Sequence, residues 1–234
     1  MSALAAEASG VDLLYVAVPA CHADVAKQCS LNVQAHPFIG DDLAKKDVAP
    51  LLELLATIDC AVIGPGIART DASLRALKDL VAAAPCPLVL DASALQPWTF
   101  DCIAHKHAVL TPHAGEWERM GLSPVDFAAA AERCGVTILA KGVIDHIATP
   151  DGSVIDVTGG NPGLTVGGTG DALAGVIAGL IAQRMDPVDA AHLASQTIKR
   201  AGDELAKEYG YAYGTRRVID RIPIVLHSLC LDCS

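Results

Sequence analysis

The chain has 234 residues, of which 52% are hydrophobic, and its formal net charge is -10 at pH 7. This length suits a single α/β domain, residues 1–234, with a large buried core. The acidic balance argues against nucleic acid or an anionic membrane as a partner, because such surfaces need clustered Lys and Arg. No apolar run reaches the roughly 18 residues of a spanning helix, and residues 1–10 do not resemble a secretory signal. We therefore expect a cytoplasmic protein.

Short β-branched runs alternate along the chain with longer helical patterns, which is typical of parallel strands joined by crossover helices. Strands are predicted over residues 11–18, 33–39, 60–64, 88–91, 108–111, 136–141, 144–148 and 154–157. Helices are predicted over 71–83, over 124–134 with Ser123 as its cap, and over 172–183, and a further helix restarts at Asp186-Pro187. Asp151-Gly152 indicates a hairpin between the last two strands, so one edge of the sheet should be antiparallel.

The run Gly167-Gly168-Thr169-Gly170-Asp171 leads directly into an apolar helix. Glycines let a backbone approach an anion closely, and the first N–H groups of a helix point at such an anion. The run therefore predicts a phosphate cradle. Asp171 has two interpretations: a reactive carboxylate at the edge of the cradle, or the N-cap of the helix over 172–183.

Chemistry-bearing residues also follow two other predicted strands, where open α/β sheets place their ligands. Gly64-Pro65-Gly66 ends one strand, either as an approach for a planar ligand or as a tight turn. Asp91 ends the next strand, and burial makes a carboxylate costly unless it is bonded. Asp91 should therefore either accept backbone N–H groups or face a cleft.

The next two strand ends carry a histidine, a glutamate and a lysine. His113 lies at a strand-to-helix junction and is expected to contact a ligand rather than to lie in the core. Glu116 lies in the first turn of the following helix, where complementing the helix dipole is the simplest role. Lys141 closes another apolar strand, where its ammonium could bind phosphate or extend into solvent.

The cysteines are interpreted as reduced packing residues, because most of them occur singly in or beside apolar segments. These are Cys21, Cys29, Cys60, Cys86, Cys102, Cys134 and Cys230. Cys230 and Cys233 form a C-x-x-C, but no second pair and no following helix accompanies it. A zinc or redox site is therefore not predicted.

Taken in order, these motifs resemble the NAD(P)H-hydrate dehydratases of the ribokinase-like superfamily over about residues 3–226. The resemblance is carried by Gly64-Pro65-Gly66, Asp91-Ala92-Ser93-Ala94-Leu95, Thr111-Pro112-His113-Ala114-Gly115-Glu116, Lys141-Gly142, Gly160-Asn161-Pro162-Gly163 and Gly167-Gly168-Thr169-Gly170-Asp171. It implies a three-layer αβα fold with a mostly parallel central sheet. The implied activity is the ADP- or ATP-dependent removal of water from hydrated NADH or NADPH.

The resemblance also implies roles for individual residues. Gly66, His113 and Asp171 would contact the hydrate, and Asp171 would be the catalytic base. The residues expected to contact the nucleotide are Lys141, Gly142, Val143, Ile144, Asp145, Gly167, Gly168, Thr169 and Gly170. Mg²⁺ would bridge the phosphates, with Glu116 holding it through water.

The chain departs from the family pattern at three places. Ser93 stands where a second acid is usual, Val143-Ile144-Asp145 replaces the usual Pro-x-Thr, and the usual first strand is expected to be missing. Two other functions remain open: a ribokinase-like kinase of a vitamin precursor, and a non-catalytic nucleotide-binding protein. We also expect a homo-oligomer, because an uncovered sheet edge and many exposed apolar residues favour association.

Overall fold

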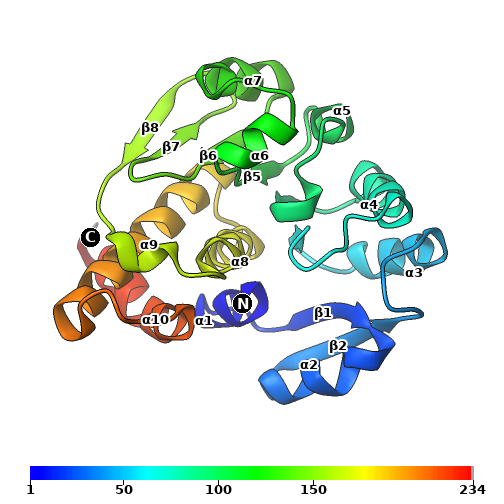
Figure 1. Cartoon of the computed structure of the whole chain (residues 1–234), viewed down its shortest axis with the longest axis horizontal. Helices are drawn as coiled ribbons and strands as arrows, with labels where there is room; N and C mark the ends of the chain where they lie inside the picture. Colours follow the sequence, from blue (N-terminus) through cyan, green and yellow to red (C-terminus); the bar gives the residue numbers. More distant parts are fainter. Residues whose placement is uncertain (233–234) are drawn as a thin grey trace.

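The strands form two separate sheets in the computed structural model, which describes residues 1–232 (Figure 1). The smaller sheet pairs β1 (Leu14–Pro19) with β2 (Val33–Phe38) in parallel. The larger sheet has six strands in the order β3-β4-β5-β6-β7-β8. These are β3 (Ala61–Ile63), β4 (Leu88–Leu90), β5 (Ala108–Leu110), β6 (Thr137–Ala140), β7 (Asp145–Ala148) and β8 (Val154–Val157).

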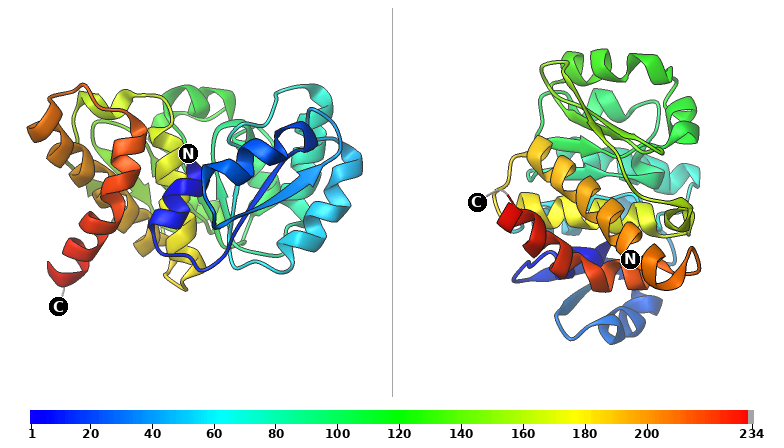
Figure 2. Two further views of the ribbon diagram at one scale, coloured as in Figure 1. Left: turned by 90° about the horizontal axis from the view of Figure 1, so that it is seen from below. Right: turned by 90° about the vertical axis from the view of Figure 1, so that its left-hand side faces the viewer.

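Pairing in the large sheet is parallel from β3 to β6 and antiparallel from β6 to β8. Asp151 and Gly152 lie between β7 and β8, which confirms the predicted hairpin and the antiparallel edge. The β1–β2 unit lies at the end of the molecule away from this hairpin (Figures 1 and 2). The separation into two sheets was not predicted.

The helices cover both faces of the large sheet (Figure 1). The helices of the described residues are α1 (Ser2–Ala8), α2 (Ala23–Cys29), α3 (Lys45–Leu55), α4 (Asp71–Ala83), α5 (Thr99–Ile103), α6 (Ala114–Arg119), α7 (Phe127–Cys134), α8 (Thr169–Ala182), α9 (Pro187–Tyr209) and α10 (Thr215–Asp232). Of these, α2 packs on β1 and β2 rather than on the large sheet. Four short 3-10 helices join them: η1 (Ala20–His22), η2 (Ala92–Ala94), η3 (Pro124–Asp126) and η4 (Pro162–Thr165).

Two apolar cores sandwich the sheet, because successive strand residues point to opposite faces. Val89 and Val109 pack with α8, α9 and α10 on one face, whereas Leu88, Leu90 and Leu110 pack with α3, α4 and α7 on the other. Each fully buried side chain of this size contributes about 1.5–3 kcal/mol. The arrangement is the expected three-layer αβα fold with a mostly parallel central sheet.

Helix α8 lies between the sheet and α1, and two glycines allow the close approach of α1. A Cβ atom at Gly175 would stand 2.1 Å from the Ser2 carbonyl oxygen, and one at Gly179 would stand 1.9 Å from Ser9 Oγ. A larger residue at Gly175 would force the two helices apart, whereas at Gly179 the Ser9 hydroxyl would first have to turn away. This contact buries α8 and fixes the direction in which its N-terminus points.

Two helix starts differ from the prediction. Helix α8 begins at Thr169 with Gly168 as its N-cap, so Asp171 is the third helical residue and the N-cap interpretation of Asp171 is wrong. Gly168 has φ +94°, a left-handed conformation that glycine adopts without a Cβ penalty. Ser123 makes no side-chain cap bond, and a 3-10 turn precedes α7, which begins at Phe127.

The interpretation of the cysteines as packing residues holds for only part of the set. Cys102 and Cys134 are buried and Cys60 and Cys86 are partly buried, and burial raises the pKa of the Cys60 thiol. The other three are exposed: Cys21, Cys29 and Cys230. Cys21 and Cys29 belong to the β1–β2 unit and its helix, where a two-stranded sheet offers little core. Cys233 lies outside the described residues.

Within residues 1–232, no helix is both long enough and apolar enough to cross a membrane.

Candidate functional site

The predicted cradle forms an open turn at the N-terminus of α8. A Cβ atom at Gly167 would meet no neighbour within 4 Å, so this part of the backbone borders free space. Thr215 Oγ1 donates a hydrogen bond of 2.9 Å to the Gly167 carbonyl and fixes the turn from outside. The N-terminus of α8 therefore borders a glycine-lined opening at Gly167, beside which the Met1 side chain packs at Gly168. Such a helix N-terminus suits an anion.

Asp171 lies in the first turn of α8, half-buried beside this opening. Burial raises the pKa of its carboxyl group and the negative charge of Asp91 raises it further, whereas the α-ammonium of Met1 and, to a smaller extent, the Lys141 ammonium lower it. A carboxylate with a raised pKa accepts protons more readily at neutral pH than an ordinary Asp. Asp171 is therefore a candidate for a general base.

Asp91 and Lys141 form an ion pair next to the cradle. Lys141 Nζ lies 2.8 Å from Asp91 Oδ1, and Thr111 Oγ1 donates to the same oxygen at 2.9 Å. Asp91 is only 2% exposed, so two side chains from adjacent strand ends compensate its burial, rather than the backbone N–H groups considered from sequence. A Cβ atom at Gly170 would lie 3.3 Å from Lys141 Nζ, which places the ammonium against the cradle.

His113 and Glu116 cap α6 reciprocally. His113 Nδ1 accepts the Gly115 N–H at 3.1 Å, and Glu116 Oε2 accepts the His113 N–H at 2.9 Å. The Glu116 side chain is buried, and its bond to the His113 N–H caps the first turn of α6. Its Oε2 also lies 3.7 Å from Lys141 Nζ. The His113 side chain is 56% exposed, so it does not lie in the core.

The two glycines after β3 differ in their surroundings. A Cβ atom at Gly64 would lie 1.8 Å from the Asp91 carbonyl oxygen, so this glycine serves close approach of two backbone segments. Gly66 has φ +75° and no neighbour within 4 Å of its Cβ position. Of the two positions, only Gly66 leaves room for a ligand.

The segment after Lys141 forms the loop between β6 and β7. Val143 is 92% exposed and Ile144 is 41% exposed, so both apolar side chains are accessible. Asp145 is instead buried, and Gly142, Ser195 and Lys199 occupy its oxygens. Of the predicted nucleotide residues in this loop, Val143 and Ile144 are therefore exposed, whereas Asp145 is buried and holds the loop in place.

Sequence reasoning missed three residues of α9 that hold this region: Ser195, Lys199 and Asp203. They recur every four residues, so they lie on one face of the helix. Polar residues at this spacing inside an otherwise apolar helix face were the available signal. Their partners lie 40 to 57 residues away in sequence, so no local pattern identifies the contacts.

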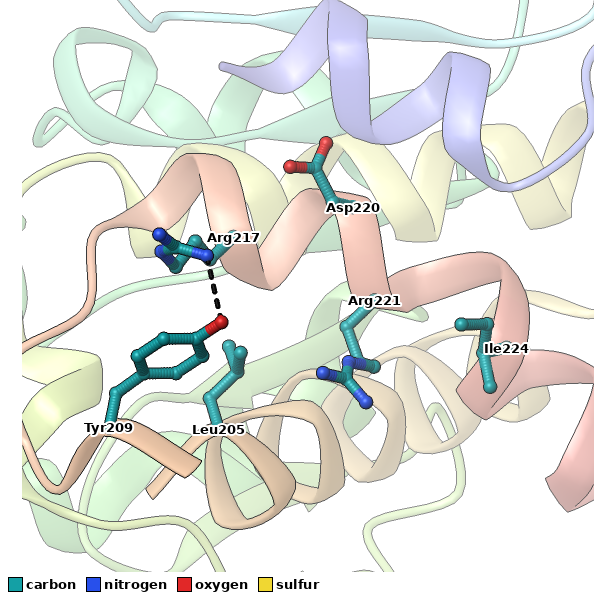
Figure 3. A pocket seen from close by; sticks show the side chains of 6 residues that line it. All are labelled: Leu205, Tyr209, Arg217, Asp220, Arg221 and Ile224. Carbon is teal, nitrogen blue, oxygen red and sulfur yellow. Dashed lines mark hydrogen bonds between the residues drawn. The ribbon is translucent and has the colours of Figure 1, made fainter. Parts of the chain in front are cut away.

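A shallow groove between α9 and α10 lies outside this site (Figure 3). Its polar side chains are already paired. Arg217 donates to Tyr209 at 3.0 Å and lies over its ring, while Arg221 contacts Glu208 at 2.6 Å. The groove therefore offers little unpaired charge to a ligand.

Comparison with known proteins identifies the family of the chain. The family model described as NAD(P)H-hydrate dehydratase matches residues 1–224. The ADP-dependent (S)-NAD(P)H-hydrate dehydratase of Nitrosopumilus maritimus is 34% identical over 97% of this chain and 82% of its own length. The bifunctional NAD(P)H-hydrate repair enzyme of Pyrobaculum aerophilum is 34% identical over 98% of this chain, which spans only 48% of that longer protein. The corresponding enzyme of Moorella thermoacetica is 37% identical over 80% of this chain and 38% of its own length.

Two solved structures have a fold similar to that of this chain. A Streptococcus mutans protein of 26% identity superposes with a TM-score of 0.83 over 97% of this chain and 84% of its own. The ADP/ATP-dependent NAD(P)H-hydrate dehydratase of Bacillus subtilis, co-crystallised with ATP and Mg²⁺ and soaked with CoA, is 25% identical. Its TM-score is 0.75 over 97% of this chain and 85% of its own. The chain belongs to the NAD(P)H-hydrate dehydratase family.

Proposed function

We propose that this chain dehydrates hydrated NADH or NADPH at the expense of ADP or ATP. The observation that carries the proposal is the half-buried Asp171 carboxylate, with its raised pKa, beside a glycine cradle and the Lys141 ammonium. Gly66 and His113 would contact the hydrate together with Asp171. The nucleotide would contact Lys141, Gly142, Val143, Ile144, Gly167, Gly168, Thr169 and Gly170, whereas the buried Asp145 would hold its loop rather than touch the nucleotide.

The proposed reaction begins at the ring hydroxyl, which is a poor leaving group. Asp171 takes the hydroxyl proton while the oxygen attacks the terminal phosphorus of the nucleotide, and the bond between that phosphorus and the nucleotide's bridging oxygen breaks. Backbone N–H groups at Gly168 to Gly170 stabilise the charge on the phosphoryl oxygens. The ring carbon–oxygen bond then breaks, phosphate leaves with its electron pair, and loss of a neighbouring ring proton restores the dihydropyridine.

Mg²⁺ is implied by this reaction, and the donors here suit a water-mediated site. Mg²⁺ typically binds one or two carboxylates, keeps several waters and takes substrate phosphates as its other ligands. In the described part of the chain, no group of three or more His, Cys, Asp or Glu residues could hold a metal ion, so the phosphates would supply much of the coordination. Glu116, near Lys141, would contact it through water. Bound Mg²⁺ would neutralise charge on the transferred phosphoryl group.

Turnover should fall on the acid side of neutrality, because only the ionised Asp171 accepts a proton. Burial raises the pKa of Asp171, so protonation on lowering the pH begins at a higher pH than for an ordinary Asp. The acid limb of the profile of kcat against pH should therefore lie above the usual range of Asp. An acid limb at the usual Asp range, with Asp171 shown to be essential, would contradict this electrostatic assignment.

Incubation of the purified protein with hydrated NADH, Mg²⁺ and either ADP or ATP tests the function. Return of the dihydronicotinamide absorbance, with release of phosphate, is the expected result. A stable phosphorylated product from a vitamin-precursor alcohol, with no dehydration, would identify a ribokinase-like kinase instead. Nucleotide binding without any turnover would identify a non-catalytic protein.

We also propose a homo-oligomer that covers the β1–β2 unit. Large apolar side chains are exposed in and around this unit: Leu13, Tyr15, Val25, Leu31 and Ile39. Apolar surface gathered on one unit favours association. Light scattering at micromolar concentration should give a multiple of the chain mass, and a monomer would contradict the proposal.

A cytoplasmic location is proposed on the state of the thiols. Cys21, Cys29, Cys60, Cys86, Cys102 and Cys134 are all free, as in proteins of reducing compartments.

A further inference from the structure

Helix α9 carries a buried lysine whose ammonium holds two loops. Lys199 is 6% exposed, and its Nζ donates to the Val143 carbonyl at 2.9 Å and to the carbonyls of Gly142 and Gly159 at 3.4 Å. Asp145 Oδ1 lies 3.5 Å from the same nitrogen. One ammonium therefore joins the β6–β7 loop to the segment that follows β8.

Asp145 ties the β6–β7 loop to α9 a second time. Its Oδ1 accepts the Gly142 N–H at 2.9 Å, and its Oδ2 accepts the Ser195 hydroxyl at 2.7 Å. Asp145 is 7% exposed, so these bonds and Lys199 compensate its burial. The backbone of residues 142–145 is thus fixed from inside, while Val143 and Ile144 remain exposed.

Asp203, one helical turn after Lys199, holds the segment after β8. Its carboxylate accepts the Gly160 N–H at 2.9 Å and the Asn161 Nδ2–H at 3.2 Å. Asn161 Oδ1 in turn accepts the Gly163 N–H at 3.0 Å and the Tyr213 hydroxyl at 2.7 Å. The chain then runs through η4 directly to the cradle at Gly167.

Both loops lead into the proposed nucleotide site. Gly142 directly follows Lys141, whose ammonium lies against the cradle, and Asn161 starts the segment that ends at Gly167. Apolar residues of similar volume often stabilise a core as well as a buried ion pair does. Charged side chains directed at backbone carbonyls and N–H groups instead specify where a loop lies.

We propose that Ser195, Lys199 and Asp203 are positioning residues. They fix the β6–β7 loop and the segment after β8 in the arrangement that binds the adenine nucleotide. The proposal rests on the proposed function in that this site receives ADP or ATP. We call these three residues the α9 clamp. They need not touch the nucleotide, so their loss should weaken its binding without removing the chemistry at Asp171.

The Lys199→Met variant tests the clamp, because Met keeps much of the side-chain length and removes the ammonium. Calorimetric titration with ADP should give a Kd raised by about tenfold or more. At saturating nucleotide and hydrate, kcat should stay within about threefold of the unmodified protein, and the KM of the hydrate should not change. Lys207→Met, the same substitution at an exposed position of α9, should leave the ADP Kd unchanged.

A second pair of variants separates positioning from stability. Lys199→Met leaves the buried Asp145 without its cation, which lowers thermal stability. Lys199→Met with Asp145→Asn removes that unpaired charge, so the melting temperature should recover while ADP binding stays weak. Asp203→Ala, at a partly exposed position, should weaken ADP binding in the same direction even if Lys199→Met fails to fold.

Three results would overturn the proposal. These are an unchanged ADP Kd in Lys199→Met, recovery of ADP affinity together with stability in the double variant, or no ADP binding by the unmodified protein. Failure of the proposed function is distinguishable, because it would appear as an unmodified protein that binds ADP but dehydrates nothing. The comparison of ADP Kd values would then still support the clamp if Lys199→Met binds more weakly.

Discussion

The Asp171→Asn variant should lose turnover by about 10²–10⁴-fold, the usual contribution of a general base. Asn keeps the shape of the carboxylate but cannot take the hydroxyl proton at neutral pH. The Kd of ADP should change little, because the cradle is formed by backbone groups of Gly167 to Gly170. Initial rates at saturating nucleotide and hydrate, together with calorimetric titration of ADP, measure both quantities.

Asp171→Ala is the matched control for Asp171→Asn. Because Gly168 is the N-cap of α8, neither substitution removes a side-chain cap. Burial raises the pKa of Asp171, so the folded protein favours the protonated form, and the ionised carboxylate weakens the fold at pH values above that pKa. The Asn variant should therefore melt at or above the temperature of the unmodified protein at neutral pH. Near-normal turnover in the Asn variant would show that Asp171 is not the base.

The strands were predictable because each buried strand is a short apolar run between turn signals. Residues 154–157 match β8, and 71–83 match α4, which begins after a Thr70 cap. The start of α8 was harder to predict from the sequence. An Asp in the first turn complements the helix dipole as well as an Asp at the N-cap, so sequence alone does not distinguish the two positions. In the structure, Gly168 with φ +94° is the N-cap of α8, which places Asp171 in the first turn.

The placement of Asp91 and Lys141 at strand ends was predictable, but the ion pair between them was not predicted. Asp91 follows β4 and Lys141 follows β6, with β5 between them, and the carboxyl ends of these parallel strands meet at one edge of the sheet. Their ion pair follows from that geometry. The α9 clamp could not be predicted in the same way, because the packing of a helix against loops sets its contacts. Separation of the β1–β2 unit likewise depends on which strand edges meet, which local patterns do not encode.

Gly64→Ala should destabilise the protein by about 2–5 kcal/mol, which combines the cost of a positive φ with that of overpacking. Gly64 has φ +124°, and a Cβ atom there would lie 1.8 Å from the Asp91 carbonyl oxygen and 2.9 Å from the Ala94 nitrogen. Both neighbours are backbone atoms, so β3 or the Asp91 segment must move. That movement would also disturb the Asp91–Lys141 ion pair beside the cradle. Urea unfolding followed by circular dichroism measures the loss.

Gly66→Ala separates the two contributions, because Gly66 has a positive φ of +75° but no neighbour within 4 Å of its Cβ position. Only the conformational cost remains at this position, so the variant should lose about 1–2 kcal/mol. The difference between the two variants then measures the contact with the Asp91 backbone. Equal losses at both positions would mean that the chain relieves this contact cheaply. The approach of the two strand ends would then not be what requires a glycine at position 64.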